Sequence, residues 1–264
     1  MRLSIITINY NNCKGLEKTL ESISNQSTKD FEWCVIDGGS TDGSVEVLRK
    51  NESLITYWKS EPDSGIYDAM NKGIKAANGD FLLFLNSGDY LCESDVISKF
   101  YEYPGDEDII YGDIMYETES GLRRIKSMSK QNLTICDFWI HTLPHQASFI
   151  KRTAFDKYGY YNEKVSVSAD WLFYIKSIII GGASYKHLDL AVAAMQPDGL
   201  SSKRTYSSEI VYLEELIPKR ILCDIPKAVS LAEIQEVPFC GFIYKVLYRL
   251  ASILKSMRHH SLNE

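Results

Sequence analysis

The sequence predicts an α/β fold in which a mainly parallel, Rossmann-like sheet is flanked by helices. Short apolar runs suited to buried strands alternate with stretches whose apolar residues recur at helical spacing, three times within the first 90 residues. Strands that alternate with helices in this way form parallel sheets covered by helices. The apolar runs also end in polar residues, and open sheets of this kind bind ligands beyond the carboxyl ends of their strands.

The expected elements follow one another with short connections. In the first half we expect strands over 3–8, 31–36, 55–58 and 81–85, and helices over 13–25, from 45 onward and over 66–77. Asn12 is placed to cap the first helix, because its side-chain oxygen can accept a hydrogen bond from the helix start. In the second half we expect a helix over 95–101, a strand over 108–117 paired with 121–128, a helix over 169–180 ended by two glycines, and a strand over 185–195. This α+β half is expected to extend the same sheet.

Size and charge bound the domain organisation and the class of partner. The 264 residues suit a main domain over 1–205, with halves 1–90 and 91–205, and a helical tail over 206–264. The formal net charge of −6 argues against general nucleic-acid binding. The six cysteines lack the spacing of a zinc site, and the start of the chain turns polar too soon for a signal peptide. No apolar run reaches the roughly 18 residues that span a bilayer, so a cytoplasmic protein is expected.

The end of the tail is basic, whereas the chain as a whole is acidic. Over 241–259 apolar residues recur on one helical face, and the other positions include Lys245, Arg249, Lys255 and Arg258. In one interpretation this basic amphipathic helix makes peripheral contact with the inner face of the cytoplasmic membrane. In the other it packs on the domain, or on a second copy of the chain in a homodimer.

Two polar loops that follow strands carry much of the chemistry. The loop over 37–44 presents the carboxylates of Asp37 and Asp42 and the hydroxyls of Ser40 and Thr41. It matches neither a P-loop nor the Gly-x-Gly-x-x-Gly fingerprint, and its groups suit hydrogen bonds to a base edge and a ribose. A pyrophosphate near several carboxylates needs a divalent cation between them, and the hard oxygen ligand Asp89 suits Mg²⁺ or Mn²⁺. Ordinary turns after core strands are the alternative for both loops.

Four motifs, taken together, resemble one known family. They are Ser4-Ile5-Ile6-Thr7 with Asn9-Tyr10-Asn11, then Asp37-Gly38-Gly39-Ser40-Thr41-Asp42-Gly43-Ser44, then Ser64-Gly65-Ile66-Tyr67-Asp68-Ala69-Met70-Asn71-Lys72-Gly73, and Gly79-Asp80 followed by Leu85-Asn86-Ser87-Gly88-Asp89. In this order and spacing the sequence is similar to the family 2 glycosyltransferases, which have the GT-A fold. The resemblance is close over about residues 1–90, looser over 140–204, and says little about the tail. It implies an inverting sugar transfer from a nucleotide-sugar donor, most commonly a UDP-sugar, with a divalent metal.

The resemblance also implies roles for individual residues. Asp37 would bind the base, and Asn86 and Asp89 would contact ribose and hold the metal. Gly88 stands where the family's carboxylate signature usually supplies the metal ligand, so either Asp89 takes this role, with help from His145 or another ligand, or the metal is held weakly. The remaining residues implied to line the donor site are Thr7, Asn9, Tyr10, Ser40, Asp42, Asp68 and Lys72.

The candidate general base lies in the second half. An inverting transfer is one in-line displacement that needs a base for the acceptor hydroxyl, and Asp170 falls where relatives carry an acidic residue before a helix. Asp170 could instead be an N-terminal helix charge favoured by the dipole. His145 resembles a histidine near the donor phosphates or the acceptor, with a structural role as the alternative. Lys203 and Arg204 would fold over the diphosphate as a basic lid, or form a solvated surface pair.

Three functions compete on the sequence. The leading one is a glycosyltransferase that extends a surface polysaccharide or glycolipid on a lipid-linked or saccharide acceptor. A sugar-phosphate nucleotidyltransferase would use a similar layer, but the Gly-rich loop with Arg and Lys expected after its first strand is absent from 9–13. The third is a non-catalytic module that binds nucleotide sugars or carbohydrate. Asp170→Asn separates it from the first, because the substitution should abolish sugar transfer in an enzyme, whereas a module transfers no sugar.

Overall fold

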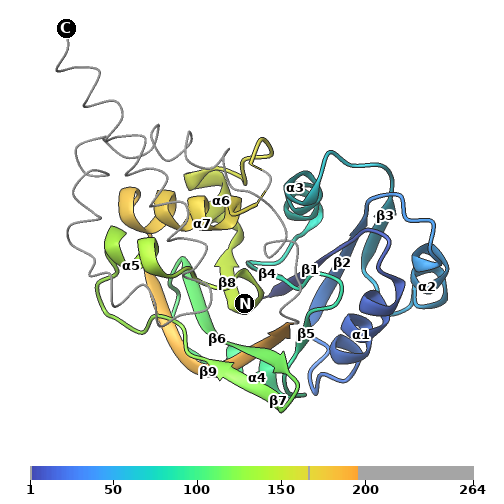
Figure 1. Cartoon of the computed structure of the whole chain (residues 1–264), viewed down its shortest axis with the longest axis horizontal. Helices are drawn as coiled ribbons and strands as arrows, with labels where there is room; N and C mark the ends of the chain where they lie inside the picture. Colours follow the sequence, from blue (N-terminus) through green and yellow to red (C-terminus); the bar gives the residue numbers. More distant parts are fainter. Residues whose placement is uncertain (1, 166, 196–264) are drawn as a thin grey trace, which may run out of the picture.

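The computed structural model describes residues 2–165 and 167–195, which form one mixed sheet with helices on both faces (Figure 1). Within these residues the strand order is β3-β2-β1-β4-β8-β6-β9-β5, and β7 pairs with β6. The strands are β1 (Leu3–Asn9), β2 (Phe31–Asp37), β3 (Tyr57–Ser60), β4 (Phe81–Phe84), β5 (Tyr90–Leu91), β6 (Ile109–Thr118), β7 (Gly121–Ile125), β8 (Ser148–Lys151) and β9 (Tyr185–Met195). The prediction of an α/β fold with one sheet shared by both halves is confirmed.

The first half is a parallel sheet in which β3, β2, β1 and β4 lie side by side. Its connecting helices are α1 (Cys13–Ser24), α2 (Ser44–Lys50) and α3 (Ile66–Ala76). Asn12 caps α1 as predicted, with its side chain accepting from Gly15 N at 3.2 Å. The third strand begins later than predicted, because Ile55 N closes a turn onto Glu52 O at 3.2 Å. Parallel pairing places the carboxyl ends of these strands at one edge of the sheet.

The second half continues the sheet with mostly antiparallel pairs. β8 joins β4 to β6, β6 and β7 form the predicted hairpin, and β9 runs parallel to β6. The predicted helix over 169–180 is present as α7 (Ala169–Tyr174) continued by a wider π-helical turn, η2 (Ile175–Ile180). The other helical elements are α4 (Val96–Glu102), α5 (Ile135–Ile140), η1 (His145–Ala147) and α6 (Arg152–Tyr158). The sequence did not predict α6 or the two-residue strand β5.

Two apolar layers hold the helices to the sheet. In Figure 1, α3, α5, α6 and α7 cover one face of the sheet, and α1 and α2 lie on the other. The first layer buries Met70 of α3 with Phe155 of α6 and Phe173 of α7. The second buries Leu16 of α1, Leu48 of α2 and residues of α4. Full burial of one such side chain contributes about 1.5–3 kcal/mol, so these layers fix the strands that position the polar loops.

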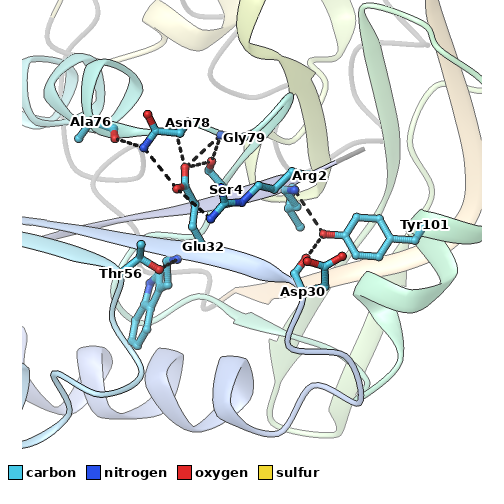
Figure 2. Close-up of polar contacts among 11 residues, drawn as sticks. Arg2, Ser4, Asp30, Glu32, Thr56, Ala76, Asn78, Gly79 and Tyr101 are labelled. Atoms are coloured by element: carbon cyan, nitrogen blue, oxygen red, sulfur yellow. Dashed lines mark hydrogen bonds and ion pairs between the residues drawn. The ribbon is translucent and has the colours of Figure 1, made fainter.

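A buried glutamate ties strands together at the amino-terminal edge of the sheet (Figure 2). Glu32 of β2 is 1% exposed and accepts hydrogen bonds from the Ser4 hydroxyl of β1 and from the backbone of Asn78 and Gly79. Gly79 fits because a side chain there would lie 2.4 Å from Ser4 Oγ. The cluster of Glu32, Ser4, Asn78 and Gly79, here called the Glu32 cluster, joins β1, β2 and the turn before β4.

The predicted tail over 206–264, with its basic helix, lies outside the described residues, as do Lys203 and Arg204. The domain boundary at 205, the membrane contact and the homodimer therefore stay predictions. Among the helices of the described residues, none is long and apolar enough to cross a membrane.

Candidate functional site

The loop over 86–89 leaves β4 at the carboxyl edge of the sheet and is held by side chains of α1. Asn12 Nδ2 donates to Ser87 O at 2.9 Å. The buried Thr19 hydroxyl donates to Asp89 O at 2.6 Å and accepts from Gly88 N at 3.0 Å. Backbone groups of a short loop are thus fixed by the helix that follows the neighbouring strand. The side chains of Asn86 and Asp89 take no part in these backbone contacts.

Gly88 has a conformational reason to be glycine. Its φ is +103°, in the left-handed region that side chains other than glycine rarely adopt. An aspartate at this position would strain the turn that Thr19 holds. The departure from the family's carboxylate signature is therefore part of how this loop is built, and it leaves Asp89 as the carboxylate of the turn.

Asp89, Asn86 and His145 form the first part of the site. Burial raises the pKa of Asp89 to about 6, although His145, a hydrogen bond from Gln146 and Lys18 favour its charged form. Asn86 Nδ2 lies 3.3 Å from His145 Nε2, and Asn86 Oδ1 is buried without a partner among the described residues. A carboxylate that burial disfavours and an unpaired amide oxygen both gain from a cation or a donor group placed between them.

His145 and Asp170 form the second part, close beside the first. His145 Nδ1 lies 2.9 Å from Asp170 Oδ2, and the Tyr67 hydroxyl donates to Asp170 Oδ1 at 3.1 Å. His145 is positioned by η1, which begins after Pro144 and leads directly into β8. Asp170 lies in the first turn of α7, and Tyr67 comes from α3. Three elements from both halves of the chain therefore meet at one carboxylate.

Each partner favours the charged form of the other, which for His145 is the form reached by taking up a proton. Burial disfavours ionisation of both groups, but their mutual hydrogen bond and charge outweigh it. The pKa of His145 is raised above its usual value by Asp170 and also by the charge of Asp89. The pKa of Asp170 is lowered by His145 and by the Tyr67 hydroxyl. The pair is thus a coupled unit that can exchange a proton with a group at its exposed side.

The described residues offer a divalent cation two oxygen ligands. No group of three or more His, Cys, Asp or Glu side chains within 2–165 and 167–195 is arranged to hold a metal ion. The donor set is the Asp89 carboxylate with the unpaired Asn86 Oδ1, and these are hard oxygen ligands. Mg²⁺ typically binds through one or two carboxylates and completes its coordination with substrate phosphates and water. The residues present fit that mode, with the remaining ligands supplied by the donor diphosphate.

The loop over 37–44 is an internally bonded platform beside this site. Asp37 is fully buried and accepts five hydrogen bonds, from Asn9 Nδ2, the Ser40 and Ser60 hydroxyls, and the backbone of Gly39 and Ser40. Burial alone would raise the pKa of Asp37, but these donors lower it. The carboxylate that the sequence assigned to the base is thus already occupied by the protein.

Other predicted residues separate into those at the platform and those away from it. Asp42 accepts from Cys13 N at 2.7 Å and from Ser44, so it anchors the starts of α1 and α2. Tyr10 is 66% exposed above the platform. Thr7 is fully buried and accepts from Trp33 Nε1 at 2.9 Å, on the face covered by α1 and α2. Thr7 thus shares a face of β1 with Asn9, and its hydroxyl oxygen is bonded by Trp33.

Asp68 and Lys72 lie together on α3. Asp68 accepts from Ser64 N at 2.9 Å at the start of the helix and pairs with Lys72 at 3.2 Å. Lys72 also pairs with Glu61 at 3.7 Å and lines a shallow hollow of about 270 Å³ between β3 and α3. Asp68, Asp89 and Asp170 do not line this hollow, so Lys72 is the predicted donor-site residue found there.

Comparison with known proteins identifies the family. The model of the glycosyl transferase family 2 matches residues 4–159. The chain belongs to glycosyltransferase family 2. It is 36% identical over 182 residues to an uncharacterized glycosyltransferase of Mycobacterium tuberculosis, which covers 67% of this chain and 69% of the relative. It is 31% identical over 223 residues to a PGL/p-HBAD biosynthesis glycosyltransferase of the same organism, covering 79% and 82% of the two chains.

Solved structures agree in fold. The glycosyltransferase has a TM-score of 0.67 and 21% identity to S. aureus TarS 1–349 in complex with UDP-GlcNAc, covering 90% of this chain and 68% of that one. Against TarS 1–349 in complex with UDP the TM-score is 0.63, and the chain spans 60% of that fragment. These neighbours are GT-A glycosyltransferases, so the predicted GT-A fold is confirmed. The family match also decides against the nucleotidyltransferase alternative.

Three residues of this glycosyltransferase were missed by sequence reasoning. Tyr67 holds Asp170, Thr19 holds the loop over 86–89, and Asn71 joins α3 to the backbone N and O of Tyr161 at 3.1 and 2.9 Å. Tyr67 and Asn71 stand within the third motif of the resemblance, and this was the available signal. Their partners lie about a hundred residues further along, and local periodicity cannot reveal them.

Proposed function

We propose that this family 2 glycosyltransferase is an inverting enzyme that moves a sugar from a nucleoside-diphosphate sugar to a saccharide or lipid-linked acceptor. The observation that carries the proposal is the convergence of Asn86, Asp89, His145 and Asp170 at the carboxyl edge of the parallel strands. Neighbours in fold are named with UDP, UDP-GlcNAc, or GDP-Man and Mn²⁺. Relatives named for PGL/p-HBAD biosynthesis support a surface polysaccharide or glycolipid as the product. A UDP-sugar is the default donor.

The proposed reaction is a single in-line displacement at the anomeric carbon. The acceptor hydroxyl loses its proton to the His145–Asp170 pair as its oxygen bonds to the anomeric carbon. The bond from that carbon to the diphosphate oxygen breaks, and the nucleoside diphosphate leaves with the electron pair. The configuration at the carbon is inverted because entry and departure occur on opposite faces.

Asp170 is the predicted general base, and its hydrogen bonds define how it would act. Both of its oxygens accept from protein donors, Tyr67 on one and His145 on the other. With His145 Nδ1 bonded to Asp170, its Nε2 is the ring nitrogen that faces Asn86. The proton is therefore taken up by the pair, with Asp170 orienting the ring and stabilising its charge.

Asp89 and Asn86 Oδ1 are the proposed ligands of Mg²⁺ or Mn²⁺. When bound, such a cation would stabilise the negative charge that develops on the departing diphosphate. His145 Nε2 lies 3.3 Å from Asn86 Nδ2, so the proposed base is next to the proposed cation site. This arrangement supports the use of Asp89 in place of a carboxylate at position 88.

A thermal-shift titration tests the proposal. The full chain is melted with UDP, GDP, ADP, CDP and UDP-sugars, each with and without Mn²⁺. A ligand that binds the folded state raises the melting temperature, by an amount equivalent to about 2.7 kcal/mol at one hundred times its dissociation constant. We expect a nucleotide-dependent rise that Mn²⁺ enlarges. No rise with any nucleotide, with or without the metal, would contradict the proposal.

A transfer assay separates the enzyme from a non-catalytic module. In the enzyme, Asp170→Asn loses sugar transfer and keeps the thermal shift produced by the donor. A module that only binds nucleotide sugars shows no transfer by the unmodified chain with any acceptor, and the substitution changes nothing.

A further inference from the structure

The hollow beside the edge strand β3 lies apart from the proposed transfer site. It has a volume of about 270 Å³ and lies between β3 and α3. Its lining includes Lys59 of β3, Lys72 and Lys75 of α3, and Glu61 in the loop after β3. None of the residues proposed to carry the transfer reaction lines it. Small molecules usually bind in concave sites where a few polar groups converge, so the charges of this lining indicate which ligand fits.

Positive charge exceeds negative charge in the lining. Three lysines face one carboxylate, which leaves two positive charges in excess. Asp68 pairs with Lys72 at 3.2 Å from outside the hollow and offsets part of this excess. Lys75 makes no ion pair among the described residues, and its ammonium group lies 5.8 Å from the ring centre of Tyr160. A chain with a formal net charge of −6 thus gathers cations at one concave place, which favours an anionic ligand.

The Glu61 carboxylate shows that an anionic group can lie between lysines of two elements. Its Oε2 lies 2.7 Å from Lys59 Nζ of β3, and its Oε1 lies 3.7 Å from Lys72 Nζ of α3. It forms no pair with Lys75. A phosphate group has more oxygens than a carboxylate, and lysine is a common phosphate ligand. A phosphate monoester carries about −1.5 to −2 charges at pH 7, which corresponds to the excess in the lining.

We propose that this hollow binds a phosphate monoester group, at a site separate from the transfer site. The ammonium groups of Lys59, Lys72 and Lys75 contact the phosphate oxygens. The phosphate competes with Glu61 for two of these lysines, and the ring of Tyr57, 41% exposed, forms part of the wall. The same chemistry has two sources, a phosphate ion or small phosphorylated molecule in solution, and the headgroup of phosphatidate in a membrane.

Calorimetry of the full chain with inorganic phosphate tests the site directly. EDTA is present to remove metal ions, and the titration is repeated with an excess of UDP at the same ionic strength. We expect phosphate binding that UDP does not change. The competition is informative because Lys72 was predicted to line the donor pocket. Loss of phosphate binding in the presence of UDP would overturn the inference, because it would place the phosphate in the donor site.

Variants of opposite charge effect locate the bound phosphate. In the double variant Lys59→Gln/Lys75→Gln we expect phosphate binding to weaken about tenfold, the size of two partly exposed ion pairs. Lys50→Gln, at an exposed position of α2, is the matched control and should stay within about twofold. Glu61→Gln should strengthen phosphate binding, because it removes the competing carboxylate, whereas the exposed Glu52→Gln should not. Melting temperatures show that each variant is folded. Weaker binding in Glu61→Gln would overturn the inference.

Sedimentation with vesicles separates the two sources of phosphate. The full chain is mixed with vesicles of phosphatidylcholine alone, or of phosphatidylcholine with phosphatidate. A loss of phosphatidate binding in the double variant, relative to Lys50→Gln, assigns the hollow to a lipid headgroup. A loss limited to inorganic phosphate assigns it to a ligand in solution. No difference between the double variant and Lys50→Gln in either assay overturns the inference. The proposed function stands in every case, because none of these measurements requires sugar transfer.

Discussion

A carboxylate lies at each end of the central strands, and the two differ in their hydrogen-bond donors and in the direction of their pKa shift. At the amino-terminal edge, Glu32 accepts hydrogen bonds from Ser4, Asn78 and Gly79, which lower its pKa although burial alone would raise it (Figure 2). At the carboxyl edge, burial dominates at Asp89 and raises its pKa to about 6, and the neighbouring Asn86 Oδ1 has no partner among the described residues. Burial is common to both, so the difference lies in how many donors the fold supplies.

The number of donors supplied by the fold distinguishes carboxylates that stabilise the sheet from those that can bind a ligand. A carboxylate whose lone pairs are filled by the backbone stabilises the fold and has no capacity for a ligand. A carboxylate that is left short of donors lowers the stability of the folded protein, and a ligand that supplies donors or positive charge restores it. By this criterion Glu32 and Asp37 have their acceptor positions filled within the fold, whereas Asp89 is left short of donors.

The largest expected effect is on the rate of sugar transfer, in variants of the His145–Asp170 pair. Asp170→Asn removes the negative charge that holds the His145 ring, and a positioned acid or base contributes typically 10²–10⁴ to a rate. We expect sugar transfer to fall by about a thousandfold, with donor binding by calorimetry within about twofold of the unmodified enzyme. His145→Gln is expected to lose a similar factor, and the double variant little more, because the pair acts as a unit. Multiplicative losses in the double variant would show that the two residues act separately.

Glu32→Ala tests the structural end of the comparison. It removes the acceptor of the Asn78 N–H and of the Ser4 hydroxyl, while the Gly79 N–H keeps the Ser4 oxygen at 2.8 Å, so the free energy of unfolding should fall by about 3 kcal/mol in urea titration. Nucleotide binding per folded molecule should not change. Glu102→Ala, at an exposed position on α4, should stay within about 0.5 kcal/mol. A loss of nucleotide binding equal to that of a site variant would break the comparison.

The pH dependence of Glu32 has a definite sign. Its pKa is lower in the folded protein than the ordinary value of 4.5, so the folded state holds fewer protons there than the unfolded state. Its contribution is complete above about 4.5 and is lost as the pH falls through the lower folded pKa. In Glu32→Gln this part of the acid dependence should disappear from urea titrations over that range.

Asp89→Asn is expected to act in the opposite direction on stability. Burial disfavours the Asp89 carboxylate, and a neutral amide of the same shape relieves this cost. At neutral pH the variant without ligands should be more stable by about 1 kcal/mol, with allowance for partial exposure. It should also lose the part of the nucleotide thermal shift that depends on Mn²⁺. Asp106→Asn, at a carboxylate 85% exposed, should change neither quantity. A destabilised variant that keeps its metal response would place Asp89 with Glu32 as a structural residue.

The sequence predicted those parts of the molecule whose cause is local. The apolar runs of β1 and β2, the Asn12 cap and the extent of α3 follow from neighbouring residues, and the structure confirms them. The helix α6 was missed because it begins directly after β8, at Arg152, with no turn signal between the two. The motifs also identified the loops that carry the site, since polar residues after parallel strands meet at one edge.

Side-chain direction could not be predicted in the same way. Thr7 was predicted to line the nucleoside pocket, and in the structure its hydroxyl accepts from Trp33 within the layer that α1 and α2 cover. Asn71 belongs to the third motif, and it is 3% exposed because the backbone of Tyr161 binds it from 90 residues away.

The smallest expected effect is on kcat, when the hydroxyl of Tyr67 is removed. Tyr67 donates to Asp170 Oδ1 at 3.1 Å, which orients the carboxylate that in turn holds His145. Tyr67→Phe keeps the ring in place, so we expect kcat to fall by about tenfold with the donor KM unchanged, the size of one hydrogen bond to a charged group. Tyr161→Phe is the matched control, because its ring lies 5.7 Å from that of Tyr67 and its buried hydroxyl has no partner among the described residues. If both variants lose the same activity, the loss comes from packing of the aromatic cluster; if only Tyr67→Phe does, the hydroxyl positions the reacting pair.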